Sequence, residues 1–163
     1  MPDARGSYAT GSIHLLRLTN FLTYSYAEIK PGPSLNMVIG PNGTGKSTIV
    51  CAIALGLCGK PDLLGRAREL QDFIKHGQDR AIIEIHLFHP EKQIVIQRMF
   101  EKGSNQSTWK LNGSKTKEAA IKEVVEGLCI QVDNLCQFLP QDRVSGFAQV
   151  KIIFFCLSID VCF

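Results

Sequence analysis

The fold is decided by residues 40–47, which read Gly40-Pro41-Asn42-Gly43-Thr44-Gly45-Lys46-Ser47. This stretch fills every fixed position of the pattern G-x-x-x-x-G-K-[ST]. The apolar run before it, residues 35–39, predicts a short strand, and the run rich in Ile, Val, Ala and Leu after it, residues 48–57, predicts a helix. A strand, a glycine loop and a helix in this order predict an α/β fold of the P-loop class.

The residue types of this loop suit a phosphate ligand. Glycine at positions 40, 43 and 45 lets the backbone turn tightly, so that its N–H groups can approach phosphate oxygens. Lys46 can reach the terminal phosphates, and the hydroxyl of Ser47 can bind Mg²⁺. A helix that begins near Lys46 adds unpaired N–H groups and the positive end of its dipole. We therefore expect a Mg²⁺-nucleotide site formed by the eight loop residues and Thr48.

Composition indicates one globular domain. The chain has 163 residues, of which 45% are hydrophobic and 20% charged, and its net charge of +3 permits but does not favour contact with nucleic acid. None of the six cysteines forms a C-x-x-C pair, so neither a zinc site nor a thioredoxin-like motif is indicated. The cysteine usage is typical of a reducing intracellular compartment.

Periodicity and turn residues predict the remaining elements. Strands are expected at residues 12–20 and 23–30, which form an antiparallel start, and then at 80–88, 93–100 and 107–111. Pro31-Gly32-Pro33 and Asn112-Gly113 are turn signals, the second being typical of a hairpin. A short helical stretch is possible around residues 68–74, and an amphipathic helix is expected at residues 116–127.

The end of the chain has a different composition. Residues 152–163 are very apolar with one charge, and this run is too short to cross a bilayer as a helix. Its apolar residues lead to Asp160, as in the second metal-binding motif of P-loop ATPases, but Val161 stands where a glutamate would follow. We therefore divide the chain into a flexible arm at residues 1–11, a lobe at 12–150 and a divergent tail at 151–163.

Several stretches together resemble a known family. Asn20-Phe21-Leu22-Thr23-Tyr24, Pro31-Gly32-Pro33 and residues 35–47 resemble the amino-terminal head of the structural maintenance of chromosomes (SMC) ATPases, a head type shared with RecF and RecN. The resemblance covers about residues 11–150 and implies an ABC-ATPase-type head with ATP and Mg²⁺ as cofactors. Residues 49–57, 65–67 and 131–144 are similar to one member in particular, whose partner is the sixth SMC subunit.

The resemblance adds two site residues to the loop and leaves a third position in doubt. A glutamine after the core strands positions the attacking water and completes the Mg²⁺ shell in this family, and Gln141 matches it better than Gln137 does. Arg66 lies where the family places an arginine near the nucleotide, although a solvated charge explains it equally well. Many relatives carry a basic residue where this chain has Leu22, so a side-chain contact to the nucleotide is in doubt at that position.

The resemblance also implies a role. It implies an ATP-binding half-head acting in DNA repair by homologous recombination and in sister-chromatid cohesion, in the nucleus and on chromosomes. The implied partners are the sixth SMC subunit, non-SMC subunits and DNA, and no membrane. Lys110, Lys115, Lys117 and Lys122 form a basic stretch that could contact phosphates, or that could simply be a solvated face.

Departures from the family bear on activity. The second metal motif, the catalytic glutamate and the signature motif belong to the carboxy-terminal lobe of such heads, and this sequence does not match them. Hydrolysis needs a positioned water and stabilised charge, so we expect ATP hydrolysis only when a carboxy-terminal lobe and a partner head complete the site. The alternatives are a free-standing P-loop NTPase or kinase, or a truncated, non-catalytic product that binds partner subunits.

Overall fold

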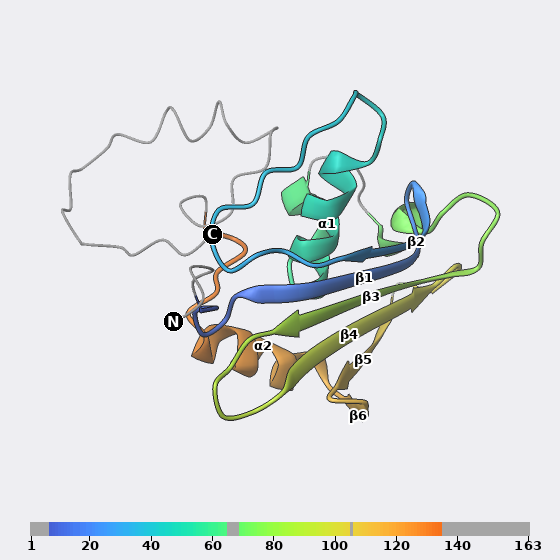
Figure 1. Cartoon of the computed structure of the whole chain (residues 1–163). Helices are drawn as coiled ribbons and strands as arrows, with labels where there is room; N and C mark the ends of the chain where they lie inside the picture. The colour runs from blue at the N-terminus through green and yellow to red at the C-terminus, as the bar shows by residue number, and fades with distance from the viewer. Residues whose placement is uncertain (1–6, 65–68, 105, 135–163) are drawn as a thin grey trace, which may run out of the picture.

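The computed structural model describes residues 7–64, 69–104 and 106–134. Six strands form one antiparallel sheet in the order β2-β1-β3-β4-β5-β6 (Figure 1). The strands are β1 (Ile13–Phe21), β2 (Tyr24–Ile29), β3 (Arg80–Leu87), β4 (Ile94–Glu101), β5 (Ser107–Leu111) and β6 (Ser114–Thr116). The α-helices are α1 (Lys46–Gly56) and α2 (Glu118–Gly127), and the 3₁₀ turns are η1 (Pro61–Leu64) and η2 (Leu70–Phe73).

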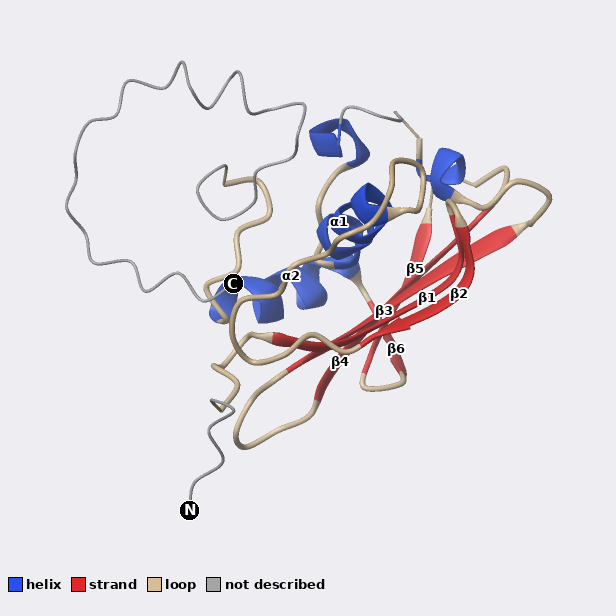
Figure 2. Ribbon diagram, turned by 45° about the horizontal axis from the view of Figure 1, so that its top comes forward, coloured by secondary structure: helices blue, strands red, loops and turns tan. Residues whose placement is uncertain are grey.

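Both α-helices cover the same face of the sheet (Figure 2). The alternation of polar and apolar residues along β3 and β4 sends every second side chain, such as Ile83, Ile85 and Ile96, into the core beneath α1. Gly56 of α1 lies so close to β3 that an added Cβ would come within 2.5 Å of Ile85. The opposite face of the sheet carries no helix among the described residues, which is common for an antiparallel sheet.

Most of the predicted elements are confirmed. The strands expected at 12–20, 23–30, 80–88, 93–100 and 107–111 correspond to β1 to β5 within about one residue at each end, and the two expected helices correspond to α1 and α2. β6 was not predicted, although the Asn112-Gly113 signal that creates the hairpin was, and both residues have positive φ. The antiparallel pairing of β1 with β3 joins the first hairpin to the later strands in one sheet.

The strand predicted at residues 35–39 is absent. These residues belong to no strand, and Leu35 and Ile39 expose 81% and 82% of their surface. Within the described ranges no neighbouring strand offers hydrogen bonds to them, and a lone apolar strand is not stable in water. The sequence pattern was therefore a correct sign of apolar character but a wrong prediction of local structure.

No helix in the part of the chain that the structure describes is long and apolar enough to cross a bilayer.

Candidate nucleotide-binding site

The glycine loop leads directly into α1. Gly43 and Gly45 have φ values of +86° and +97°, a left-handed conformation that glycine adopts without strain. Gly45 is the residue that caps the helix, and its carbonyl accepts the first helical hydrogen bond, from the N–H of Thr48, at 2.9 Å. The loop itself is exposed from Pro41 to Thr44, so a ligand can reach its backbone.

The turn between β1 and β2 packs against the glycine loop and the start of α1. A Cβ added to Gly45 would lie 2.7 Å from Oγ1 of Thr23 and 2.8 Å from the hydroxyl oxygen of Tyr24. The Tyr24 hydroxyl donates to the carbonyl of Thr44 at 3.3 Å, and Oγ1 of Thr23 lies 3.4 Å from Oγ1 of Thr48. Only glycine fits between this turn and the start of α1.

Lys46 folds its side chain back over the loop. Its Nζ donates to the carbonyl oxygens of Gly40 and Pro41 at 2.5 and 2.6 Å, and the Thr44 hydroxyl donates to the same Pro41 carbonyl at 2.9 Å. The ammonium therefore lies at the loop, where a phosphate oxygen would have to replace these carbonyls as its partner.

The amino end of α1 suits an anion. No side chain of the described residues caps this end, and its first turn has no acidic residue. Its N–H groups and the positive end of the helix dipole therefore face the loop without a competing carboxylate from these residues. Ser47, the second residue of α1, is half-buried and offers a hydroxyl oxygen of the kind that Mg²⁺ prefers. The donor set therefore fits a Mg²⁺-nucleotide, and the Ser47 hydroxyl is the candidate protein ligand to the metal.

A further basic residue near the loop escaped the sequence analysis. Lys75 lies between η2 and β3, where its backbone N–H donates to the carbonyl of Asn20 at 2.9 Å. Its Nζ donates to the carbonyl of Thr23 at 3.1 Å, which places the charge at the turn that braces the loop. Fifty-two residues separate Lys75 from Thr23, and no local pattern in the sequence marks the lysine.

The remaining predicted site residues fall outside the described ranges. These are Arg66, Gln141 and its alternative Gln137. Leu22, where many relatives carry a basic residue, has a φ of +46° and donates its backbone N–H to the carbonyl of Phe73 at 2.9 Å. Its side chain packs against the hydrophobic core, so an apolar group stands where the resemblance implies a charge in many relatives.

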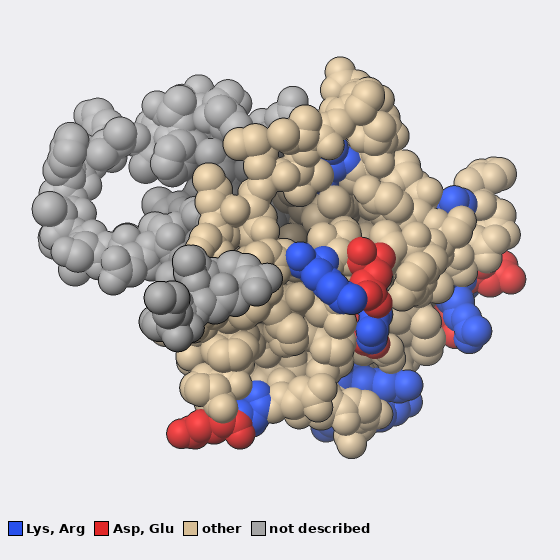
Figure 3. Space-filling view, in the orientation of Figure 1, with Lys and Arg blue, Asp and Glu red and all other residues tan. Residues whose placement is uncertain are grey.

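The basic stretch predicted at residues 110–122 is divided between two parts of the fold. Lys110 and Lys115 are direct cross-strand partners on the open sheet face, opposite the helices. Lys117 precedes α2, and Lys122 lies on α2, 3.8 Å from Glu126. Figure 3 shows basic side chains gathered over the lower part of the molecule, where Figure 1 places β5 and β6. The stretch is therefore not one continuous surface.

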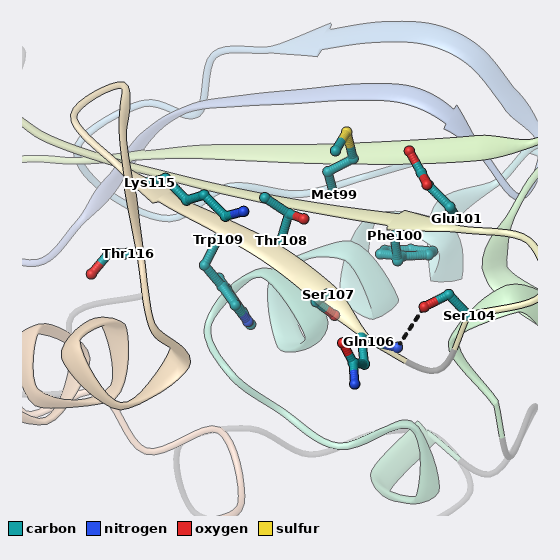
Figure 4. A pocket seen from close by; sticks show the side chains of 10 residues that line it. All are labelled: Met99, Phe100, Glu101, Ser104, Gln106, Ser107, Thr108, Trp109, Lys115 and Thr116. Carbon is teal, nitrogen blue, oxygen red and sulfur yellow. Dashed lines mark hydrogen bonds between the residues drawn. The ribbon is translucent and has the colours of Figure 1, made fainter.

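A shallow polar hollow of about 310 Å³ lies near the ends of β4, β5 and β6 (Figure 4). Ser104, Thr108 and Lys115 are among its lining residues, and none of the glycine-loop residues lines it. The hollow is thus separate from the nucleotide site.

Comparison with known proteins agrees with this geometry. A family model described as an AAA domain matches residues 15–160. The chain is 46% identical to structural maintenance of chromosomes protein 5 of Schizosaccharomyces pombe and 45% identical to that of Arabidopsis thaliana, in each case over 88% of the chain. It spans only 13% and 14% of the length of these relatives.

Solved structures confirm the fold. An SMC head bound to the C-terminal winged-helix domain of ScpA superposes with a TM-score of 0.78 at 24% identity, over 88% of this chain and 47% of that one. A structure from work on ATP-driven dimerisation of SMC ATPases superposes with a TM-score of 0.77 at 23% identity, over 90% of this chain and 93% of that one. The predicted α/β P-loop head fold is therefore confirmed, and the chain belongs to the AAA domain family and to the structural maintenance of chromosomes family.

Proposed function

We propose that this chain is the ATP-binding amino-terminal part of an SMC-type ATPase head. The observation that carries the proposal is the uncapped amino end of α1 behind a glycine loop whose lysine already lies at the loop. Neutral ligands gain little from such a site, whereas the phosphates of Mg²⁺-ATP match its N–H groups, its ammonium and the hydroxyl of Ser47.

Three residues extend this proposed site. Lys75 would add a second positive charge beside the turn that braces the loop, where Leu22 supplies none. Gln141 would position the attacking water and bind Mg²⁺, and Arg66 would contact the nucleotide. The roles of Gln141 and Arg66 rest on the family resemblance, whereas that of Lys75 rests on its contacts. The proposed division into an arm at residues 1–11, a lobe at 12–150 and a tail at 151–163 leaves Gln141 inside the lobe.

We expect ATP hydrolysis only in a completed head. The exposed residues 35–39 lie directly before the glycine loop and lack a strand partner in the described ranges, so they offer an apolar surface to a further lobe. Similarity to SMC protein 6 of Saccharomyces cerevisiae, at 29% identity, and to an SMC head bound to ScpA supports the sixth SMC subunit and non-SMC subunits as partners. The role would be DNA repair and sister-chromatid cohesion on chromosomes in the nucleus.

The test is calorimetric titration of the purified chain with Mg²⁺-ATP, with phosphate release followed in parallel. Lys46→Ala should weaken binding by at least about 2 kcal/mol, because it removes a charge-assisted contact to the terminal phosphates. Lys122→Ala, which removes an exposed lysine paired with Glu126 on α2, is the matched control and should bind like the unchanged chain.

The outcomes of the titration and of the phosphate-release assay distinguish the proposed function from its alternatives. Binding that Lys46→Ala abolishes, with negligible phosphate release, supports the half-head. Rapid turnover by the chain alone would favour a free-standing NTPase or kinase instead. Equal binding by the unchanged chain and Lys46→Ala would contradict the proposed site, and binding of partner subunits without nucleotide would favour the non-catalytic product.

Two lysines on the open face of the sheet are candidates for a contact to DNA. Like charges directly opposite each other destabilise a strand pair, yet Lys110 and Lys115 occupy such a position. A phosphate backbone across β5 and β6 would compensate both charges without reading bases. We therefore propose these two lysines, rather than the whole stretch to Lys122, as the contact.

The salt dependence of binding to a fluorescent duplex tests this contact. The double variant Lys110→Ala/Lys115→Ala should reduce the slope of log affinity against log salt by about 1 to 2, because each lost phosphate contact removes about 0.9. The double variant Lys117→Ala/Lys122→Ala carries the same charge change at α2 and should keep the slope. A loss confined to the α2 variant would assign the contact to the helix instead.

A further inference from the structure

Arg98 on β4 is the charged side chain that the core encloses in the described part of the chain, with 5% of its surface exposed. Among the described residues, no carboxylate forms a hydrogen bond or an ion pair with it. Burial lowers the pKa of this guanidinium, but an arginine pKa lies so far above neutrality that the group stays charged. A buried charge is stable only when surrounding dipoles or opposite charges compensate it.

The partners of Arg98 come from α1, from the segment that follows α1 and from β5. Its Nη1 donates to the carbonyl of Leu55 in the last turn of α1 at 2.7 Å and lies 3.5 Å from the carbonyl oxygen of Gly59. Its Nε donates to the Ser107 hydroxyl at 2.9 Å, and its Cζ lies 4.6 Å from the centre of the Trp109 ring. Trp109 in turn donates to Glu118 in the first turn of α2 at 3.3 Å.

These contacts give α1 the cation that its own sequence lacks. The last turn of α1 has no basic residue, although a positive charge is favourable at the carboxyl end of a helix. Arg98 supplies that charge from the sheet and satisfies a carbonyl that the helix leaves unpaired. The charge and the helix end therefore depend on each other, because a shift of α1 would leave a buried cation without its main acceptor.

The other end of α1 carries the nucleotide site. The helix has 11 residues and so is a stiff rod about 16 Å long, from Lys46 and Ser47 at one end to the Arg98 contact at the other. We propose that Arg98 is a positioning residue: it locks the carboxyl end of α1 against β4 and β5, and so holds Lys46 and Ser47 in place for the phosphates. This inference rests on the proposed function.

The test compares two Arg98 variants with a core control, in the full chain. Arg98→Met removes the charge and keeps most of the volume, whereas Arg98→Lys keeps a charge but cannot form the two-armed contact to Leu55 and Ser107. Val125→Ala removes buried volume from α2 instead. Mg²⁺-ATP affinity is measured by calorimetry, and hydrogen exchange of the α1 amides is measured without nucleotide. Far-ultraviolet circular dichroism checks that each variant folds.

Arg98→Met should weaken Mg²⁺-ATP binding about tenfold and speed exchange in α1 by a similar factor, a tenfold change being the scale of one strong contact. Arg98→Lys should recover part of both losses, and Val125→Ala should change neither by more than about twofold at this scale. Affinity and exchange in Arg98→Met equal to those of Val125→Ala would overturn the inference.

Two further outcomes are also decisive. If the unchanged chain does not bind Mg²⁺-ATP, the proposed function fails, and α1 exchange alone still decides whether Arg98 locks the helix. If Arg98→Met does not fold, Arg98→Lys and Ser107→Ala take its place. Ser107→Ala removes one acceptor from Arg98 and should weaken Mg²⁺-ATP binding and speed α1 exchange, both by less than Arg98→Met. If Ser107→Ala changed neither measurement, the result would count against a role for Arg98 in holding α1.

Discussion

At the scale of single residues, the shape of the candidate nucleotide site depends on positions that carry no side chain. Gly45 combines a positive φ with a position so close to Thr23 and Tyr24 that no Cβ fits. Gly77, in the turn before β3, has a similar φ of +80°, but its hypothetical Cβ meets no atom within 4 Å. The two glycines therefore separate the effect of backbone conformation from the effect of close packing.

We expect Gly45→Ala to lower the free energy of unfolding by more than Gly77→Ala does. Both substitutions force alanine into the left-handed region, at about 1–2 kcal/mol, but only Gly45→Ala adds overpacking, at about 1–3 kcal/mol. Urea unfolding measures both values. Equal losses in the two variants would mean that the β1–β2 turn does not press on the loop.

At the scale of elements, two apolar segments of similar composition have opposite environments. The alternate residues of β3, among them Ile83, are fully buried beneath α1, whereas Ile39 in the segment before the loop is exposed. The burial of an isoleucine depends on a neighbouring strand or helix and not on the residue itself. A segment with no such neighbour contributes little to the stability of the fold.

The substitution Ile39→Ala should therefore change the free energy of unfolding by less than about 0.5 kcal/mol, as is usual at an exposed position. The same substitution at Ile83 should cost about 2–5 kcal/mol, because it leaves a cavity in the core. Denaturant titrations of the two variants give the comparison directly. A large loss in Ile39→Ala would show that residues 35–39 pack against the rest of the chain.

At the scale of the whole molecule, a polar row crosses the open face of the sheet. Arg17 on β1 donates to Glu28 on β2 at 2.8 Å and to Glu84 on β3 at 3.0 Å, and Gln97 on β4 donates to the same Glu84 at 3.1 Å. His86 lies 2.7 Å from Glu84 as well. This row joins four strands on the face that the helices leave open, so protons taken up there affect the sheet as a unit.

Two of the groups on this face, His14 and Glu84, contribute to the pH dependence of the stability. Burial and the neighbouring His86 lower the pKa of His14 below its ordinary 6.5. Burial raises the pKa of Glu84, but the hydrogen bonds with His86 and Arg17 lower it by more than burial raises it. The pKa of Glu84 therefore lies below its ordinary value of 4.5. In both cases the unfolded chain takes up the proton at a higher pH than the folded chain does. The free energy of unfolding therefore falls as the pH falls.

His14→Phe should therefore flatten the loss of stability as the pH drops below 6.5, because phenylalanine keeps the ring but cannot titrate. Glu84→Gln should leave that window steep and flatten the loss below pH 4.5 instead. Urea midpoints measured across both windows separate the two. An unchanged slope below pH 6.5 in His14→Phe would mean that another histidine causes the loss.

The glycine loop, α1 and the five longer strands were predictable because their signals are local. Each signal is carried by a run of at most about ten neighbouring residues. Examples are the glycine-loop pattern, the alternation of polar and apolar residues at 80–88 and the Asn112-Gly113 turn. Lys75 and Arg98 were not predictable as parts of the site, because their partners Thr23 and Leu55 are 52 and 43 residues away. The strand expected at residues 35–39 was wrong for a related reason, since a strand needs partners that its own sequence does not contain.

The sequence by itself determined the family, because the motifs that mark it are short runs of neighbouring residues. It also determined the phosphate-type loop and the type of nearly every helix and strand, because backbone conformation depends largely on neighbouring residues. Only the tertiary structure decided which elements meet: β1 beside β3, the β1–β2 turn behind Gly45, and Arg98 beneath the end of α1. Those contacts arise when distant segments bury apolar surface together, and burial depends on the whole chain.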